Sequence, residues 1–338
     1  MVTLADVARL SATSRSTASR ALNNDARISR ATTDRVRLVA DALGYRPNLA
    51  ARSLSTGRSG IIGLILPTGQ LTGDPYGAQL VGAVTTRAAL GDHATMLWLS
   101  HREPSGAVHE VLRNGLVDGL VISIVAQDDP WVNDLLDGPL PCALIGRHTG
   151  RDDVSYASID NILSTRALMA HVLEEGYRRI AMIRGPIGNA DSDERYAMYA
   201  EALGGPEAVD ANLVTVGAFD YDSGYRCAKS LLRSDADCIV AANDHMALGA
   251  VDAILDSGLS IPGDVAVTGW DDMREISRAT IGLTTVRHDV EAVGREATSI
   301  LLEMLAGAAG PIQRTLPTSL VVRESTQRQH VPVAVGGG

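Results

Sequence analysis

The sequence predicts two structural regions in one chain: a small all-α N-terminal region and a larger α/β body with parallel sheets flanked by helices. Residues 3–43 combine helix caps with apolar residues at helical spacing. From residue 61 onward, short apolar strands alternate with helical stretches, which is typical of βαβ units. The net charge also changes sign near residue 60. Residues 1–60 contain ten arginines and four aspartates, a net +6, so the remainder carries −16 of the chain's total of −10.

Two short helices are predicted at the N-terminus. Thr3 and Asp6 have the spacing of a capping box, and Ser14 is an N-cap that opens a second helix ending at Leu22. Ala18, Ala21 and Leu22 face inward on that helix. Its outward face is rich in hydrogen-bond donors and contains no carboxylate: Arg15, Ser16, Ser19 and Arg20. This pattern predicts a helix-turn-helix whose second helix reads DNA.

A third amphipathic helix is predicted over Ile28–Leu43, with Ser29 as its cap and Gly44 following its C-terminus. The chain continues as YRPNLAARSL over residues 45–54. Alone, residues 48–55 are too short for a stable isolated helix, because such segments are marginal below about 12 residues, and a plain linker is the alternative.

Together with the later motifs ANDHMALGA, GWDD and LTTV, these segments resemble the LacI/GalR family of transcriptional regulators, from Thr3 to about Ser325. The resemblance implies an all-α helix-turn-helix headpiece joined to a two-lobed, periplasmic-binding-protein-like α/β effector domain. The implied divisions are the headpiece at 1–46, the hinge helix and linker at 47–60, an N-lobe at about 61–160 and 290–318, and a C-lobe at about 161–289 and 319–330. Residues 331–338 are expected to form a disordered tail.

The resemblance assigns base contacts to Arg15, Ser16 and Arg20, and arginine can bond guanine O6 and N7 together in the major groove. Side chains suited to phosphate contacts are Thr3, Ser14, Thr17, Ser19 and Asn23. The hinge helix would place Asn48, Ala51 and Leu54 at the minor groove, with Leu54 as an apolar wedge that kinks the duplex. One departure is Ala12, where the family usually has glycine, so that either the turn differs or alanine accepts a strained backbone.

The resemblance also places a small-molecule effector, a sugar or sugar derivative, between the lobes at the carboxyl ends of the strands. The residues expected to bind it are Tyr76, Arg147, Arg195, Phe219, Asn243 and Asp271. Arg147 is a second departure, because lactose-type repressors have an acidic residue on this loop. Two interpretations stay open: Arg147 meets an acidic or substituted sugar, or it pairs with an acidic neighbour such as Asp160.

Composition limits the other functional classes. The sequence has no apolar run of the roughly 18 residues that span a bilayer and no signal-peptide pattern, so a cytoplasmic protein without membrane contact is expected. Three cysteines without CxxC spacing and scattered histidines predict neither disulfides nor a metal site. We expect no enzymatic activity and no cofactor, because no nucleophile–base pair or phosphate-binding loop is evident.

The expected partners are near-palindromic operator DNA and a second copy of the chain, with a tetramer left open. Apolar stripes over 79–90 and 107–116 are candidates for the dimer face, although helix-on-sheet packing gives the same pattern. The alternative function is that of a periplasmic-type solute-binding protein, which would need an export signal and has no use for a basic headpiece.

Overall fold

The computed structural model describes residues 2–23, 25–46, 57–67, 75–100, 115–123, 130–273 and 281–328. The chain divides into two compact units between Ser59 and Gly60, the headpiece and the body. None of the helices in the described ranges is long and apolar enough to cross a membrane.

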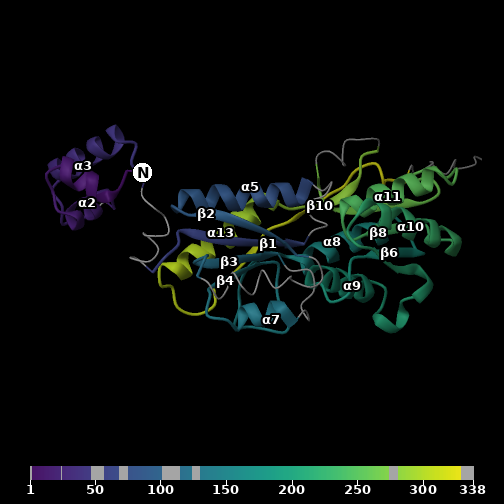
Figure 1. Ribbon diagram of the computed structural model, residues 1–338. Coiled ribbons are helices and arrows are strands. Elements are labelled where there is room, and N and C mark those ends of the chain that lie inside the picture. The colour runs from purple at the N-terminus through teal and green to yellow at the C-terminus, as the bar shows by residue number, and fades with distance from the viewer. Residues whose placement is uncertain are drawn as a thin grey trace, which may run out of the picture. The chain divides into compact units, whose positions relative to one another are not determined.

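The headpiece contains three helices around a small core (Figure 1): α1 (Leu4–Leu10), α2 (Arg15–Leu22) and α3 (Arg30–Ala42). Its fully or nearly fully buried side chains are Val7, Ala8, Ala18, Ala21, Val36 and Ala40. The predicted capping box at Thr3 and Asp6 is present, and Ser14 and Ser29 cap α2 and α3 as expected. The helix-turn-helix predicted from caps and spacing is therefore confirmed.

The turn between α1 and α2 contains a left-handed residue that is not glycine. Ala12 has φ of 51°, and the Thr13 amide donates to the Ala8 carbonyl at 2.9 Å, which closes α1 in the same way that Gly44 and Tyr45 close α3. Alanine thus accepts the strained backbone here, at a cost of roughly 1–2 kcal/mol relative to the right-handed region. The turn therefore contains a left-handed residue although glycine is absent.

The body contains two six-stranded sheets. Sheet A is entirely parallel and runs in the spatial order β11 (Gln313–Leu316), β5 (Ser155–Ile159), β4 (Cys142–Ile145), β3 (Gly119–Ser123), β1 (Ile61–Pro67) and β2 (Ala94–Ser100). Helices α5 (Pro75–Leu90) and α13 (Val290–Leu305) cover one face, and α7 (Pro130–Leu136) packs on the other (Figure 1). Alternation along β1 explains this arrangement, because Ile62, Leu64 and Leu66 enter one core and Ile65 enters the other.

Sheet B is parallel except for its last strand. Its order is β12 (Ser319–Val321), β10 (Thr284–Arg287), β9 (Ala266–Asp271), β8 (Cys238–Ala241), β6 (Ile180–Arg184) and β7 (Val214–Val216). Its helices are α8 (Asn161–Glu174), α9 (Ala190–Ala202), α10 (Tyr221–Leu231) and α11 (Asp244–Leu255). Helices α8 and α9 pack together, as do α10 and α11. Figure 1 shows α9 and α11 on opposite sides of β6 and β8.

Three segments connect the two sheets: residue 160 between β5 and α8, residues 288–289 between β10 and α13, and residues 317–318 between β11 and β12. Asp160 and Asp289 cap the helices that follow them, and a short hydrogen bond joins Ser164 to Thr318. The predicted fold class, a helical headpiece with two α/β lobes, is confirmed.

Five strands do not have the continuous apolar runs of the central strands. Strands β5, β7, β10, β11 and β12 are short, and all five lie at or beside the edge of a sheet. Helix α5 begins at Pro75, four residues before the predicted start at 79. Its apolar residues Leu80, Val84 and Ala88 are fully buried inside the chain, so the predicted stripe over 79–90 forms lobe core. The second stripe, at 107–116, lies mostly outside the described residues.

Candidate functional sites

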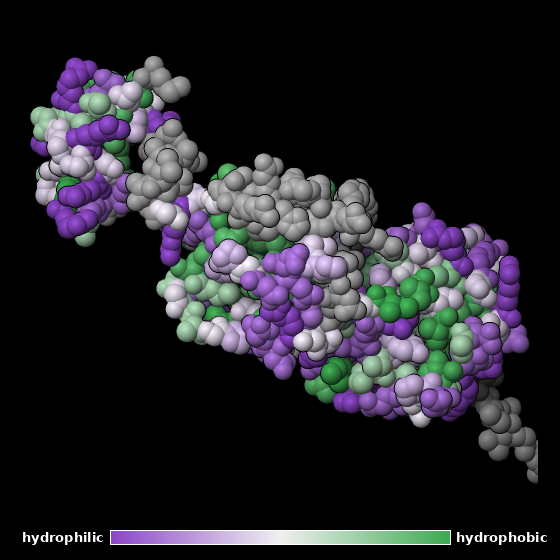
Figure 2. All heavy atoms as spheres, turned by 60° about the horizontal axis from the view of Figure 1, so that its bottom comes forward, coloured by the Kyte–Doolittle hydropathy of each residue, from purple (hydrophilic) through white to green (hydrophobic). Residues whose placement is uncertain are grey.

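The exposed face of α2 carries the predicted base-reading side chains. Arg15, Ser16 and Arg20 are exposed, while Ala18 and Ala21 on the opposite face are completely buried. The Ser14 hydroxyl accepts from the Thr17 amide at 3.1 Å and lies 2.8 Å from the Thr17 hydroxyl, so both oxygens sit at the start of the helix. Figure 2 shows mostly hydrophilic residues on the visible face of the headpiece. A helix of this kind presents donors to base edges and phosphates.

The remaining predicted phosphate contacts also lie on the headpiece surface. Thr3 and Asn23 are exposed and Ser19 is half-buried. The hydroxyl of Thr3 is engaged in the capping box, 2.7 Å from Asp6 Oδ2. The hinge positions Asn48, Ala51 and Leu54 lie outside the described residues.

The second candidate site lies between the lobes, at the carboxyl ends of the strands. Arg147 follows β4 of sheet A, Asn243 follows β8 of sheet B, and Asp271 ends β9. Arg147 of the first lobe contacts Glu194 on α9 of the second, which shows that the two carboxyl edges face each other. In open α/β sheets such edges are where ligands bind.

Arg195 on α9 is buried beside the carboxyl edge of sheet B. Its Nε donates to Asn161 Oδ1 at 3.0 Å, its Nη1 donates to the Ala242 carbonyl at 2.6 Å, and its guanidinium stacks on the Trp270 ring at 4.1 Å. Only 5% of Arg195 is exposed. A guanidinium fixed on this many sides is a rigid donor, because little conformational freedom is left to lose when a ligand binds.

Arg147 makes an ion pair within the protein. Its Nη2 lies 2.7 Å from Glu194 Oε1, while Asp160, the predicted neighbour, accepts the Leu163 amide and caps α8. Arg147 therefore pairs with an acidic residue, but with a different one from the residue suggested by sequence proximity. Burial raises the pKa of Glu194, and the hydrogen bond from Asn161 and the charge of Arg147 oppose that effect.

Asn243 and Phe219 are joined by a hydrogen bond at the carboxyl edge of sheet B. The Asn243 side chain caps α11 by accepting the Met246 amide, and its Nδ2 donates to the Phe219 carbonyl at 2.9 Å. Phe219 has φ of 64°, and its ring lies so close to Gly185 that a Cβ there would come within 2.2 Å. Asn243 thus has a structural role whether or not it also touches a ligand.

Asp271 is buried, adopts a strained backbone conformation and contacts His288. It has φ of 105° and is 8% exposed, and its Oδ1 lies 3.0 Å from His288 Nε2. Within the described part of the chain, His288 Nδ1 is buried and has no hydrogen-bond partner. The His288 ring makes an edge contact with the Tyr76 ring, with 6.2 Å between the ring centroids. Strained residues held by their surroundings cluster at functional sites. The three side chains join β9, a crossover and α5, and so connect the two lobes.

Two neighbouring carboxyl groups have different environments. Burial and the nearby Asp271 raise the pKa of Asp244 well above its usual value, although Thr285 and the Met273 amide donate to it. Burial also acts on Asp272, but hydrogen bonds from Arg287 and Arg323 outweigh it, and the pKa of Asp272 is lowered. Asp244 is packed against Gly269, where a Cβ would come within 2.2 Å of Oδ1. Asp244 and Asp272 are structural supports of the strand end that carries Asp271.

Sequence reasoning did not assign Asn161 or His288 to the site, and the structure places them beside the predicted residues, together with Asp191 and Glu194. Asn161 Nδ2 donates to Asp191 and Glu194, which links the start of α8 to α9. These residues follow a crossover or lie near the start of a helix, and such a position could have suggested them. That they lie close together depends on how the two lobes meet. No cluster of metal-ligating side chains occurs within the described ranges.

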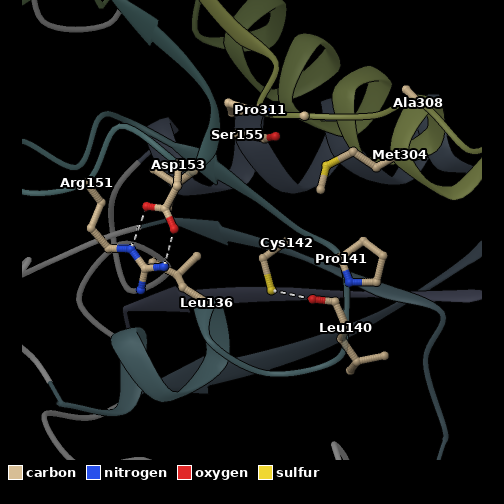
Figure 3. Close-up of a pocket in the computed structure, with 12 residues that line it drawn as sticks. Leu136, Leu140, Pro141, Cys142, Arg151, Asp153, Ser155, Met304, Ala308 and Pro311 are labelled. Carbon is tan, nitrogen blue, oxygen red and sulfur yellow. Dashed lines mark hydrogen bonds and ion pairs between the residues drawn. The ribbon is translucent and has the colours of Figure 1, made fainter.

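A separate pocket of about 300 Å³ lies at the amino ends of β4 and β5 (Figure 3). Two aspartates already hold its arginine: Arg151 donates to Asp153 through Nε and Nη2, and to Asp137 through Nη1. Burial raises the pKa of the Cys142 thiol to about 12, and its Sγ donates to the Leu140 carbonyl. This pocket offers a ligand no uncommitted charge.

The fold and the two sites define a DNA-binding protein with a ligand-binding body of two lobes. Residues 3–48 match the bacterial regulatory proteins of the lacI family, and residues 169–326 match the periplasmic binding protein-like domain. The chain is 36% identical to the HTH-type transcriptional regulator CelR of Thermobifida fusca over 336 residues, which is 96% of this chain and 98% of the relative. The chain belongs to the lacI family of bacterial regulatory proteins. It is a DNA-binding transcriptional regulator and not an enzyme.

Solved structures agree with this assignment. The complex of the transcriptional regulator CelR with cellobiose has a TM-score of 0.73 at 34% identity, and covers 96% of this chain and 100% of its own. The lac repressor dimer bound to operator and the anti-inducer ONPF has a TM-score of 0.83 at 27% identity, with coverage of 97% and 99%. Because the similarity spans the headpiece as well as the lobes, a solute-binding protein without DNA function is excluded.

Proposed function

We propose that this regulator is a repressor that binds a near-palindromic operator as a homodimer, and that a sugar or sugar derivative between its lobes controls operator affinity. The observation that carries the proposal is the pairing of an exposed arginine-bearing recognition helix with a buried polar cleft at three crossovers. The CelR–cellobiose complex supports a sugar as effector, and the operator-bound lac repressor dimer supports the dimeric state.

On the headpiece, Arg15, Ser16 and Arg20 would contact bases. Thr3, Ser14, Thr17, Ser19 and Asn23 would contact phosphates. One recognition helix reads one half-site, so a two-fold symmetric pair of chains reads both. Exposed apolar side chains at the β2 edge of the body, Leu97 and Leu99, suit a contact between copies.

In the cleft, Tyr76, Arg147, Arg195, Phe219, Asn243 and Asp271 would surround the effector. Asp271 would accept from sugar hydroxyls and Arg195 would help to position them. The lobes would correspond to residues 61–160 with 290–318 and 161–289 with 319–330, and the assignment of strands to sheets A and B supports this division. The whole regulator would act in the cytoplasm, where its operator is.

The coupling between the two sites would pass through the hinge. Effector binding would change how the lobes meet, and so whether two hinge segments can pair and insert Leu54 into the minor groove. Replacing Leu54 with alanine is expected to weaken operator binding and leave effector binding intact. Loss of both would make Leu54 a structural residue.

The decisive experiment tests whether operator and sugar affect each other's affinity equally. A sugar that changes operator affinity by some factor must have its own affinity changed by the same factor when operator is bound. Calorimetric titration of cellobiose and related sugars, with and without saturating operator, measures this factor. Equal sugar affinity in both titrations would contradict the proposed coupling.

A further inference from the structure

The ion pair between Arg147 and Glu194 is a direct bridge between the lobes. Arg147 belongs to the segment after β4 and Glu194 to α9, and their Nη2 and Oε1 atoms are 2.7 Å apart. The Glu194 side chain is only 10% exposed, whereas that of Arg147 is 37% exposed. The arginine is therefore the accessible half of the pair, and the carboxylate is the enclosed half.

Glu194 is held in place from its other side. Asn161 Nδ2 donates to Glu194 Oε2 at 3.0 Å and to Asp191 Oδ1 at 2.8 Å, while Asn161 Oδ1 accepts from Arg195 Nε. Moving Glu194 away from Arg147 would disturb hydrogen bonds that reach the buried guanidinium of Arg195. A carboxylate fixed in this way keeps Arg147 occupied.

The same arrangement determines what charge a ligand can bring. Arg147 is committed to Glu194, and Nε and Nη1 of Arg195 are committed to Asn161 and the Ala242 carbonyl. Asp191, Glu194 and Asp271 add carboxylates to the cleft. A ligand carboxylate would have to displace Glu194 or approach these groups, and a buried unpaired charge is strongly unfavourable. Neutral hydroxyl groups can donate to the same carboxylates without that cost.

We propose that Glu194 is a specificity-determining residue of the effector cleft: by holding Arg147 across the two lobes, it excludes anionic effectors and restricts the cleft to neutral sugars. This inference rests on the proposed sugar-binding function and adds the charge class of the effector. It also assigns Arg147 a partner inside the protein instead of an acidic group on the ligand.

The test uses the full-length protein and three variants, Arg147→Gln, Glu194→Gln and the double variant. Glutamine keeps the length of glutamate and can still accept from Asn161. The matched control is Glu201→Gln, because Glu201 lies on the same helix and pairs with Arg166 within one lobe. Calorimetric titration compares cellobiose with the uronic acid derived from it, which differs by one carboxylate. Thermal unfolding without ligand measures the coupling between Arg147 and Glu194.

We expect wild-type protein to prefer cellobiose and Glu194→Gln to gain about tenfold or more in relative affinity for the uronic acid, since hydrogen bonds to charged groups contribute on that scale. The double variant should lose this gain because the freed cation is gone, and Glu201→Gln should behave as wild type. The unfolding midpoints should show coupling between the two positions in the absence of ligand.

Several outcomes would overturn the inference: no coupling between the two positions, a wild type that binds both ligands equally, or a gain that persists in the double variant. If wild type binds neither sugar, the proposed effector class fails. The inference is then decided by whether Glu194→Gln alone acquires affinity for the uronic acid. Acquisition supports the role of Glu194, and its absence refutes that role.

Discussion

The headpiece and the effector cleft use arginine in opposite ways. All eight arginines between residues 9 and 46 are exposed. In the cleft, Arg147 is paired with Glu194, and Arg195 is buried and bonded to an amide and a carbonyl. Exposed cations are available to a polyanion, whereas committed cations orient a ligand without requiring it to carry charge. Under the proposed function, the difference teaches how one chain would bind DNA electrostatically and still recognise an uncharged molecule.

The largest expected difference between the two regions is in how strongly salt weakens ligand binding. If the headpiece makes six or more phosphate contacts, operator affinity should fall roughly 1000-fold or more between about 50 and 200 mM salt, because counterions are released on binding. Effector affinity should change little, since the proposed effector is uncharged and releases no counterions. Fluorescence anisotropy with labelled operator and calorimetry with cellobiose measure the two dependences. Similar slopes for both ligands would remove the basis of the comparison.

Arg20→Ala tests whether an exposed arginine reads sequence. We expect a loss of about 1–3 kcal/mol on the preferred operator and relaxed selectivity at one base position. Arg27→Ala is the matched control, because Arg27 is also exposed but makes a 2.6 Å ion pair with Asp25. Electrophoretic mobility shifts on a set of single-base operator variants provide the readout. A loss that is uniform over all sequences would make Arg20 a phosphate contact instead.

Asp271→Asn tests the cleft in the same way. The effector affinity should fall by about 1.5–3 kcal/mol if Asp271 accepts hydrogen bonds from the ligand as a charged group. Operator affinity without effector should remain near that of wild type. Asp272→Asn is the control: Asp272 is adjacent but bonded to Arg287 and Arg323, so its change should lower stability more than ligand affinity. If both variants lose ligand equally, Asp271 supports the strand end without contacting the ligand.

The smallest expected effect is on the stability of the headpiece and comes from backbone strain. Ala12 is exposed with φ of 51°, so Ala12→Gly should stabilise the headpiece by about 0.5–1 kcal/mol, because glycine adopts this conformation freely. The same substitution at Ala31, which is exposed and helical in α3, should destabilise it by about 0.5–1 kcal/mol. Thermal unfolding of the full chain, followed through the headpiece transition, gives both values. Equal signs at the two positions would show that Ala12 is not strained in solution.

Local chemistry made the headpiece predictable. Its helix starts depend on side-chain caps at Thr3, Ser14 and Ser29, each of which acts within three residues of its own position. The fully buried central strands β1, β3 and β4 were equally visible, because continuous apolar runs identify strands covered on both faces. Short strands such as β11 and β12 carry polar residues and alternate weakly, so their pairing becomes evident only beside β5 and β10.

The cleft was predictable only in part. Family motifs indicated Arg195, Asn243 and Asp271, and the structure brings all three to the carboxyl edge of sheet B. Asp160, which was named as an example of an acidic neighbour for Arg147, instead caps a helix. His288 gave no signal in the sequence, although it lies 3.0 Å from Asp271.

By itself, the sequence determined the class of each region: a basic helix-turn-helix, a two-lobed α/β body and the motifs that connect them. The helix-turn-helix and the strand–helix alternation depend on caps, periodicity and charge, which act between residues close together in the chain. The division of the body into two lobes was implied by the resemblance to the LacI/GalR family. Only the tertiary structure decided which charges neutralise one another. The pair of Arg147 and Glu194 joins residues 47 positions apart on two different lobes, and no local pattern specifies a contact that arises from the way two separately built sheets face each other.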